Sequence, residues 1–245
     1  MRARSLFTVA GIAVCSTLSL GAVVQLQAAR DNTLFEESPS FSNGIGTGLF
    51  AGETSVGQIR RGLIAFDLTS IPAGSVVNSV RLTMRMSRTA TGSEPVQLHF
   101  ALAAWGEGTS NADVMGGGGG DEATPNDATW SHRLWGGAEW STPGGDFRPD
   151  ASALTAVAGT GFYSWSGPGV IADVQSWVNN AGVNNGWFIL GNESINQTAK
   201  RFDTREVATF ANRPVLEVDY TVPNPASGLV LALAGATFRR RHRRN

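Results

Sequence analysis

The chain has 245 residues, enough for one or two domains, and its 42% hydrophobic content supplies a core that a disordered protein would lack. Thirty glycines and only 16% charged residues favour a loop-rich β protein over a helical bundle. Seven of the 19 basic residues lie at the two ends, which leaves 12 bases against 20 acids and a charge of about −8 between them. Such an acidic body repels phosphate, and we therefore expect no nucleic-acid partner.

Residues 1–28 have the pattern of a secretory signal peptide. The basic start MRAR precedes the apolar run SLFTVAGIAVCSTLSLGAVV, and small residues predict cleavage near Ala28 or Ala29. Cleavage there would remove Cys15 and leave a mature chain without cysteine, which excludes disulfides and thiolate chemistry. An uncleaved membrane anchor is the alternative. We expect a secreted protein whose folded domain covers residues 30–222.

Alternating apolar and polar residues predict half-buried antiparallel strands through this domain, and more uniformly apolar runs predict central strands. These segments are residues 62–68, 79–86, 96–102, 186–191 and 215–221. One segment differs, because Val170, Val174 and Trp177 recur at helical spacing. We predict an all-β fold, a jelly-roll-like two-sheet antiparallel β-sandwich with long loops and one short helix that covers an end.

Between Leu102 and Gly169 the regular pattern fails for some 65 residues, and glycine, asparagine, proline and tryptophan are frequent. Loops this long are functional or disordered, and recurring tryptophans argue against disorder. The candidate ligand-binding aromatics are Trp105, Trp130, Trp135 and Trp140. An indole face can stack on a sugar ring, and the alternative is a small core beneath the loop. The run of five glycines predicts only flexibility, since no Lys-Ser/Thr follows it.

Carboxylates in the same loop are candidate ligands for a structural calcium ion, because oxygen ligands on glycine-rich and asparagine-rich loops suit this ion. The candidate metal ligands are Asp113, Asp121 and Asp127. Solvated loop acids are the alternative interpretation. A glycosidase-type acid pair stays open, as does an enzyme that uses His132 or Tyr163. The serine-hydrolase elbow G-x-S-x-G does not occur in the sequence.

The most charge-dense stretch, residues 199–220, begins with AKRFDTRE. Alternation places Arg201, Asp203 and Arg205 on one face of a strand and predicts that Phe202 points inward. These three charged residues form either a structural ion-pair ladder or the positive patch that an acidic glycan needs. We include them among the candidate ligand-binding residues.

Residues 223–245 continue from a Pro-x-Pro turn into about 12 apolar residues and an arginine cluster. This tail resembles the PEP-CTERM class of C-terminal sorting signals on VPNPAS, the apolar run and RRRHRR, although Asn224 stands where that class has glutamate. The resemblance implies processing by an exosortase-type sorting enzyme. The apolar run is shorter than the roughly 20 residues of a spanning helix, and we expect only transient membrane association.

Eight stretches in chain order resemble the DNRLRE domain family of secreted bacterial proteins, related to disaggregatase repeats and to carbohydrate-binding module family 96. They are RRGLIAFDLTSIPAGSVVNSVRLTM, AAWGEGTS, DATWSHRLW, STPGGDF, VIADVQSWV, NNGWFILGNE, TAKRFDTRE and RPVLEVDY. The resemblance covers nearly all of residues 30–220 and implies a β-sandwich that binds glycans without catalysis. It transfers no individual binding residue.

Three hypotheses for function follow. The first is a secreted, surface-sorted protein of the bacterial envelope or extracellular matrix that binds polysaccharide and is not an enzyme. The second is a structural envelope or matrix protein without a specific ligand. The third is a glycan hydrolase or lyase.

Overall fold

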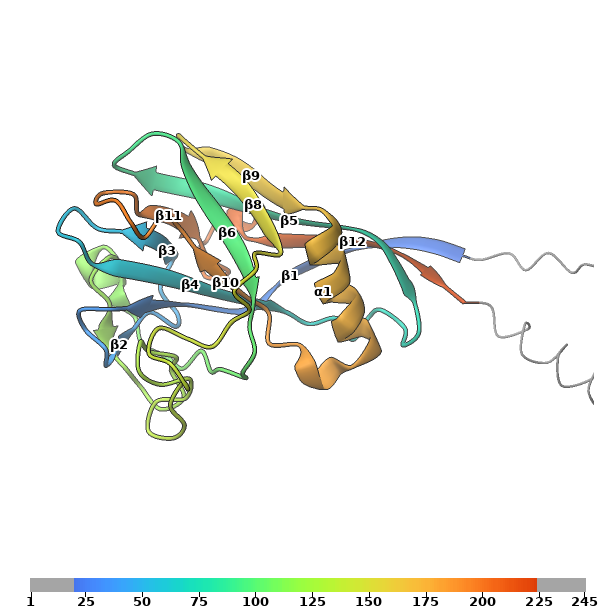
Figure 1. The fold of residues 1–245 in the computed structure, drawn as a ribbon, viewed down its shortest axis with the longest axis horizontal. Coiled ribbons are helices and arrows are strands. Elements are labelled where there is room, and N and C mark those ends of the chain that lie inside the picture. Colours follow the sequence, from blue (N-terminus) through green and yellow to red (C-terminus); the bar gives the residue numbers. More distant parts are fainter. Residues whose placement is uncertain (1–19, 224–245) are drawn as a thin grey trace, which may run out of the picture.

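The structure is a computed structural model that describes residues 20–223. The predicted sorting tail from residue 224 and the first 19 residues of the predicted leader lie outside the described residues. Within the described part the chain folds into a two-layer antiparallel β-sandwich with one α-helix, which confirms the predicted fold class (Figure 1).

The strands of the two layers run as follows. Sheet I contains the first half of β1 (Leu20–Phe35), β12 (Val215–Val222), β5 (Val76–Thr89), β9 (Gly161–Ser166), β11 (Lys200–Asp203) and β3 (Gly48–Glu53). Sheet II contains the second half of β1, the end of β3, β4 (Ile59–Phe66), β10 (Trp187–Leu190), β6 (Glu94–Phe100) and β8 (Ala153–Val157). β1 and β3 pair in both layers and so join them.

The remaining elements are short. A small two-stranded sheet is formed by β2 (Phe41–Ser42) and β7 (Asp121–Glu122). The helices are α1 (Pro168–Asn179) and the 3₁₀ turns η1 (Ala112–Met115), η2 (Ala181–Val183) and η3 (Phe210–Asn212). Among residues 20–223 no helix is long and apolar enough to cross a bilayer.

The main core lies between the two sheets. In β5 the alternate residues Leu82, Met84 and Met86 are fully buried, and they belong to one apolar cluster with Trp187 and Ile189 of β10. Burying each side chain of this size contributes about 1.5–3 kcal/mol. The period-two alternation in the sequence therefore indicates which face of β5 packs against the opposite sheet.

Helix α1 closes one end of this core, as its sequence pattern predicts. Val170, Val174 and Trp177 are buried in the same cluster, and the ring of Trp177 lies 4.5 Å from that of Trp187. Asp173 of the helix is also buried, and its carboxylate accepts a hydrogen bond of 2.8 Å from Nε1 of Trp187. This bond fixes the helix to β10.

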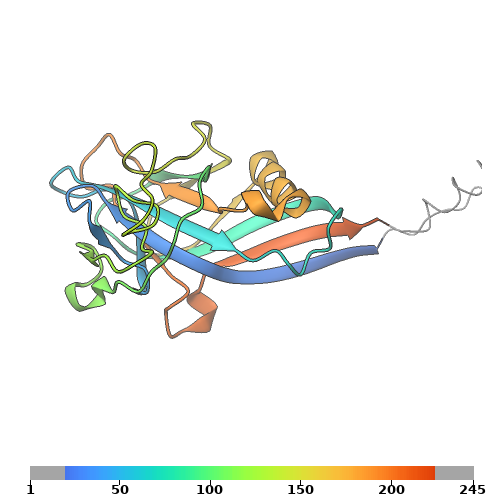
Figure 2. The same ribbon diagram turned by 90° about the horizontal axis from the view of Figure 1, so that it is seen from below.

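Strand β1 begins eight residues before the predicted end of the signal peptide. Residues 20–27 pair in register with Val215–Val222, and Ala22, Val24 and Leu26 pack against the main core. Figure 2 shows β1 and β12 side by side to the end of the sandwich. The predicted boundary at residue 28 therefore falls inside a paired strand rather than ahead of the domain.

A chain that starts at Ala29 should be less stable than one that starts at Leu20, because β12 would keep β5 but lose β1 and so expose an unpaired edge. Three half-buried side chains would leave the core as well, and we expect the Tm to fall by about 5–10 °C. Circular dichroism during heating measures this difference. N-terminal sequencing of the secreted protein should find a start before Val24, and equal Tm values with a start at Ala29 would contradict the expectation.

Candidate functional site

The regular alternation of β5 ends at Ser87. Arg88 would be the next inward residue after Met86, but the register with β11 shifts here: Arg88 lies opposite Arg201 and Met86 lies opposite Phe202. Ser87 is therefore the extra residue of a β-bulge. Bulges redirect side chains and often occur beside functional sites. This bulge turns Arg88 away from the core, and its side chain is exposed.

The bulge sets three side chains in a row across the outer face of sheet I. Arg201 of β11 lies directly opposite Arg88 of β5 on one side and Phe50 of β3 on the other. Like charges directly opposite each other destabilise a sheet. The row therefore needs negative charge from elsewhere.

Arg201 obtains that charge within the fold. Its Nη1 atom donates to Asp203 at 3.0 Å and to Oγ of Ser87 at 2.6 Å, while Nη2 donates to Oγ1 of Thr47 at 3.0 Å. Asp203 also accepts from Arg85 at 2.8 Å. One carboxylate thus serves two arginines, which confirms an ion-pair ladder for Arg201 and Asp203.

Arg88 has no such partner. Its guanidinium donates to the carbonyl oxygen of Gly116 at 3.2 Å and lies 5.9 Å from the ring centre of Phe50. No carboxylate of residues 20–223 lies within ion-pair distance of it. The positive charge of Arg88 is therefore available to a ligand.

Two adjoining hollows share Arg88 and Arg201, and together we call them the arginine hollow. The first, of about 310 Å³, is lined by Phe50, Ala90 and Ala199 and also by threonines and Arg60. The second, of about 400 Å³, is more polar and is lined by Thr47, Ser87, Asp113 and Gly116. The site therefore combines an apolar wall, hydroxyl groups, three guanidinium groups and the carboxylate of Asp113.

The rim of the arginine hollow comes from the glycine run that the sequence assigns only to flexibility. Gly118 accepts a hydrogen bond of 3.1 Å from Nε of Arg60, which is itself paired with Glu37. Gly117 has φ of +80°, and a Cβ atom there would lie 3.3 Å from the ring of Phe50. Glycine at this position lets the backbone lie against Phe50 without closing the hollow.

Trp105 and Trp140, two of the four predicted stacking aromatics, belong to a second core. Their exposed fractions are 1% and 5%, and they pack with Leu63 and Phe188 against the outer face of sheet II. Each Nε1 atom donates to a backbone carbonyl, that of Asn185 for Trp105 and of Thr129 for Trp140. Neither ring can stack on a sugar, so this expectation is wrong for both.

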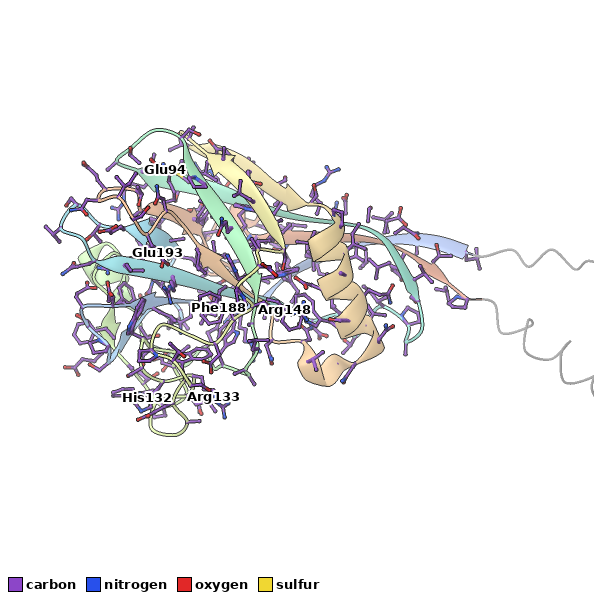
Figure 3. The ribbon with its side chains drawn as sticks, in the orientation of Figure 1. Glu94, His132, Arg133, Arg148, Phe188 and Glu193 are labelled. Carbon is purple, nitrogen blue, oxygen red and sulfur yellow. The ribbon has the colours of Figure 1, made fainter. Side chains whose placement is uncertain are left out.

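The other two tryptophans are half-buried. Trp130 lies under the guanidinium of Arg61 at 4.8 Å, and Trp135 contacts the His132 ring edge-on at 4.8 Å. His132 bonds through Nδ1 to Oγ of Ser131 at 2.8 Å, and its Nε2 lies 3.7 Å from Glu139. Figure 3 places His132 on the long loop, beside Arg133. It lines neither part of the arginine hollow.

The three predicted calcium ligands lie apart. Asp113 accepts from the backbone N–H of Thr47 at 2.9 Å, Asp127 accepts from that of Thr124 at 2.7 Å, and Asp121 is exposed in β7. Burial raises the pKa of Asp127. In the part of the chain that the structure describes, no three Asp, Glu, His or Cys side chains are placed to hold a metal ion. The loop acids instead hold the loops together.

Arg205 is not a member of the ladder that alternation predicts. β11 ends at Asp203, and the side chain of Arg205 pairs instead with Glu107 and Glu206. Phe202 is fully buried against Trp165, as predicted. The predicted binding set therefore contributes Arg201 to the arginine hollow, with Asp203 as its ion-pair partner outside the lining, while Arg205 lies elsewhere.

The sequence reasoning missed Phe50, Arg60 and Arg88. One signal for Arg88 is present, because the pattern of β5 puts an arginine where the next core residue belongs. A charged residue at a core position indicates a bulge or the end of a strand. No protein-family model matches the chain, and no curated protein does, so the site rests on its geometry.

Replacing Trp105 by alanine should cost about 3–5 kcal/mol of unfolding free energy, because it leaves a cavity beneath the loop and an unpaired carbonyl at Asn185. The matched change Trp135→Ala, at a half-buried ring, should cost about 1 kcal/mol. Urea unfolding followed by fluorescence measures both. An unchanged midpoint in Trp105→Ala would show that the second core does not support the fold.

Proposed function

We propose that this protein is a secreted, non-catalytic polysaccharide-binding protein of the bacterial envelope or matrix, and that the arginine hollow binds an acidic sugar chain. The observation that carries the proposal is Arg88, an exposed cation directed outward by a bulge, opposite a second arginine and without an acidic partner in residues 20–223. An anionic ligand would reduce the repulsion between the guanidinium groups of Arg88 and Arg201.

The chemistry of the hollow suits a sugar acid. A guanidinium group can bind a carboxylate or sulfate through two parallel hydrogen bonds, which a neutral hydroxyl cannot match. Phe50 and the neighbouring alanines offer apolar contact for the C–H face of a sugar ring. Each of the two hollows has the size of a small ligand pocket, and together they suit two consecutive units of a chain.

The net negative charge of the domain means that an acidic glycan must be attracted by a local group of basic residues rather than by the overall charge of the protein. With a charge of about −8 between the two ends, the protein as a whole repels a polyanion. Binding must therefore come from close contacts at Arg88 and Arg201. Salt screens contacts at such short range less than it screens an attraction over more than a Debye length.

The leader and tail support placement outside the cell. The predicted signal peptide directs secretion, and the tail, by its resemblance, would be a substrate of an exosortase-type enzyme after transient membrane association. The resemblance to the DNRLRE family also supports a protein that binds glycans without catalysis. Calcium binding stays a prediction, and residues 20–223 bring no three Asp, Glu, His or Cys side chains together to hold the ion.

The proposal is tested by affinity electrophoresis in gels that contain a polyuronate, a sulfated glycan or a neutral glycan. We expect retardation by an acidic polymer, and Arg88→Gln should weaken it about 10–100-fold, the effect of losing a hydrogen bond to a charged group. Arg133→Gln is the matched control. Arg133 also donates to a backbone carbonyl, that of Ala104 at 3.0 Å, and Figure 3 shows it on the long loop beside His132.

Each contrary outcome identifies an alternative. Equal weakening by Arg88→Gln and Arg133→Gln would move the binding site away from the arginine hollow. Retardation by none of the glycans would favour a structural envelope protein without a ligand. Release of soluble sugar from a bound glycan, lost in His132→Ala, would show an enzyme.

A further inference from the structure

A second group of charges lies where β1 meets the segment that follows β11. Asp31 of β1 is wholly buried, with an exposed fraction of 0%. Around it lie Glu107 from the long loop and Arg205 and Glu206 from the segment after β11. We call these four residues the acid cluster. It lies outside the arginine hollow and contains three carboxyl groups around one guanidinium group.

Arg205 contacts at least one oxygen of each of the three carboxyl groups. Its Nε atom lies 2.9 Å from Oε1 of Glu107 and 3.0 Å from Oε1 of Glu206, and its backbone N–H donates to Oδ2 of Asp31 at 3.0 Å. The backbone N–H of Asp31 donates in turn to Glu107 at 2.8 Å. These bonds connect β1, the long loop and the segment after β11 at one point.

Two carboxyl oxygens are left over. Oδ1 of Asp31 and Oε2 of Glu206 are both buried, and neither has a hydrogen-bond donor within residues 20–223. If both groups were ionised, two anionic oxygens would be buried without a donor, which is among the most unfavourable arrangements in a protein. A proton on one of the two carboxyls removes a charge and supplies the missing donor.

We propose that the pair Asp31 and Glu206 retains in the folded chain one proton that the unfolded chain releases, and that this proton holds the segment of residues 204–213 against β1. The electrostatics agree with the geometry. Burial, followed by the charge of Glu206, raises the pKa of Asp31 well above its ordinary value, and burial also raises the pKa of Glu206. Glu107 acts in the same direction on both, and Arg205 opposes it. Arg30 also faces Glu107.

The proton makes stability depend on pH in a definite direction. The unfolded chain releases it at the ordinary carboxyl pKa, whereas the folded chain keeps it to a higher pH. Unfolding therefore releases a proton between these two values, and stability falls as pH rises through that window. One retained proton changes the unfolding equilibrium about tenfold per pH unit.

The segment held in this way projects from the sandwich and carries an exposed aromatic residue. Figure 2 shows η3 on the face opposite α1, and Phe210 within it is 64% exposed. Loss of the proton leaves two buried anionic oxygens without a donor and should loosen this segment first. The acid cluster would then act as a latch that is closed below the raised pKa and opens above it.

The test uses the full chain and three variants. Asp31→Asn replaces one buried carboxyl group by an uncharged amide with a permanent N–H donor, Glu206→Gln does the same at the second carboxyl group, and Glu139→Gln changes an acid whose side chain is 74% exposed. Unfolding equilibria in urea are measured from about pH 4 to about pH 9. We expect the wild type and Glu139→Gln to lose stability as pH rises, and either cluster variant to lose most of that slope.

A second measurement applies even if a cluster variant fails to fold. Carboxyl ¹³C shifts of the labelled wild type should show one Asp and one Glu that titrate together at raised pH, and amides of residues 205–213 should exchange faster above that transition. Two carboxyls that titrate at ordinary values would overturn the proposal. Calcium that stabilises the wild type but not Asp31→Asn would also overturn it, because the leftover oxygens would then bind a cation.

Discussion

The fold depends on the double pairing of β1. Its first half pairs with β12 in sheet I, and after a register shift near Ala28 its second half pairs with β4 in sheet II. A strand that belongs to both layers fixes their separation at one edge of the sandwich. It also carries Asp31 into the interior immediately after the crossing, where water cannot solvate the carboxylate. The burial of that acid is thus a consequence of topology.

Strands β4, β5, β6, β10 and β12, helix α1 and the inward position of Phe202 were predictable, because each is encoded in a local period. Strand β1 lies partly in the predicted leader, β3 was not predicted, and β8 and β9 lie in the region that was expected to be irregular. Alternation in β5 and helical spacing in α1 need no knowledge of distant residues. The sequence indicates which apolar residues are available for the two cores, but not which of them pack together. Whether Trp105 faces solvent depends on Leu63 and Phe188, which lie far from it in sequence.

The arginine hollow was predictable only in part. Arg201 and Asp203 stand out as a charged pair on one strand, but their neighbours come from β3, β5 and the glycine run. A β-bulge adds a residue without changing composition, so the sequence of β5 alone does not place Arg88 beside Arg201. The same limit applies to Arg205, because the end of β11 decides which way its side chain points.

The arginine hollow and the acid cluster differ in the sign of their excess charge and in its burial. In the arginine hollow the fold places like charges together at the surface and leaves one of them unneutralised. In the acid cluster it buries excess negative charge around a single guanidinium group. β11 and the segment after it contribute to both, so Asp203 and Arg205, two residues apart, belong to different electrostatic environments.

The position of β12 has a mechanical consequence for the proposed attachment of the protein through its C-terminal tail. β12 pairs with β1 on one edge and with β5 on the other, and it ends at Val222. A pull on that end along the strand would load both ladders in shear, so many hydrogen bonds would have to break together rather than one after another. The force would pass through β5 directly to Arg88, so the C-terminal end of β12 and the arginine hollow lie on one continuous path of paired backbone.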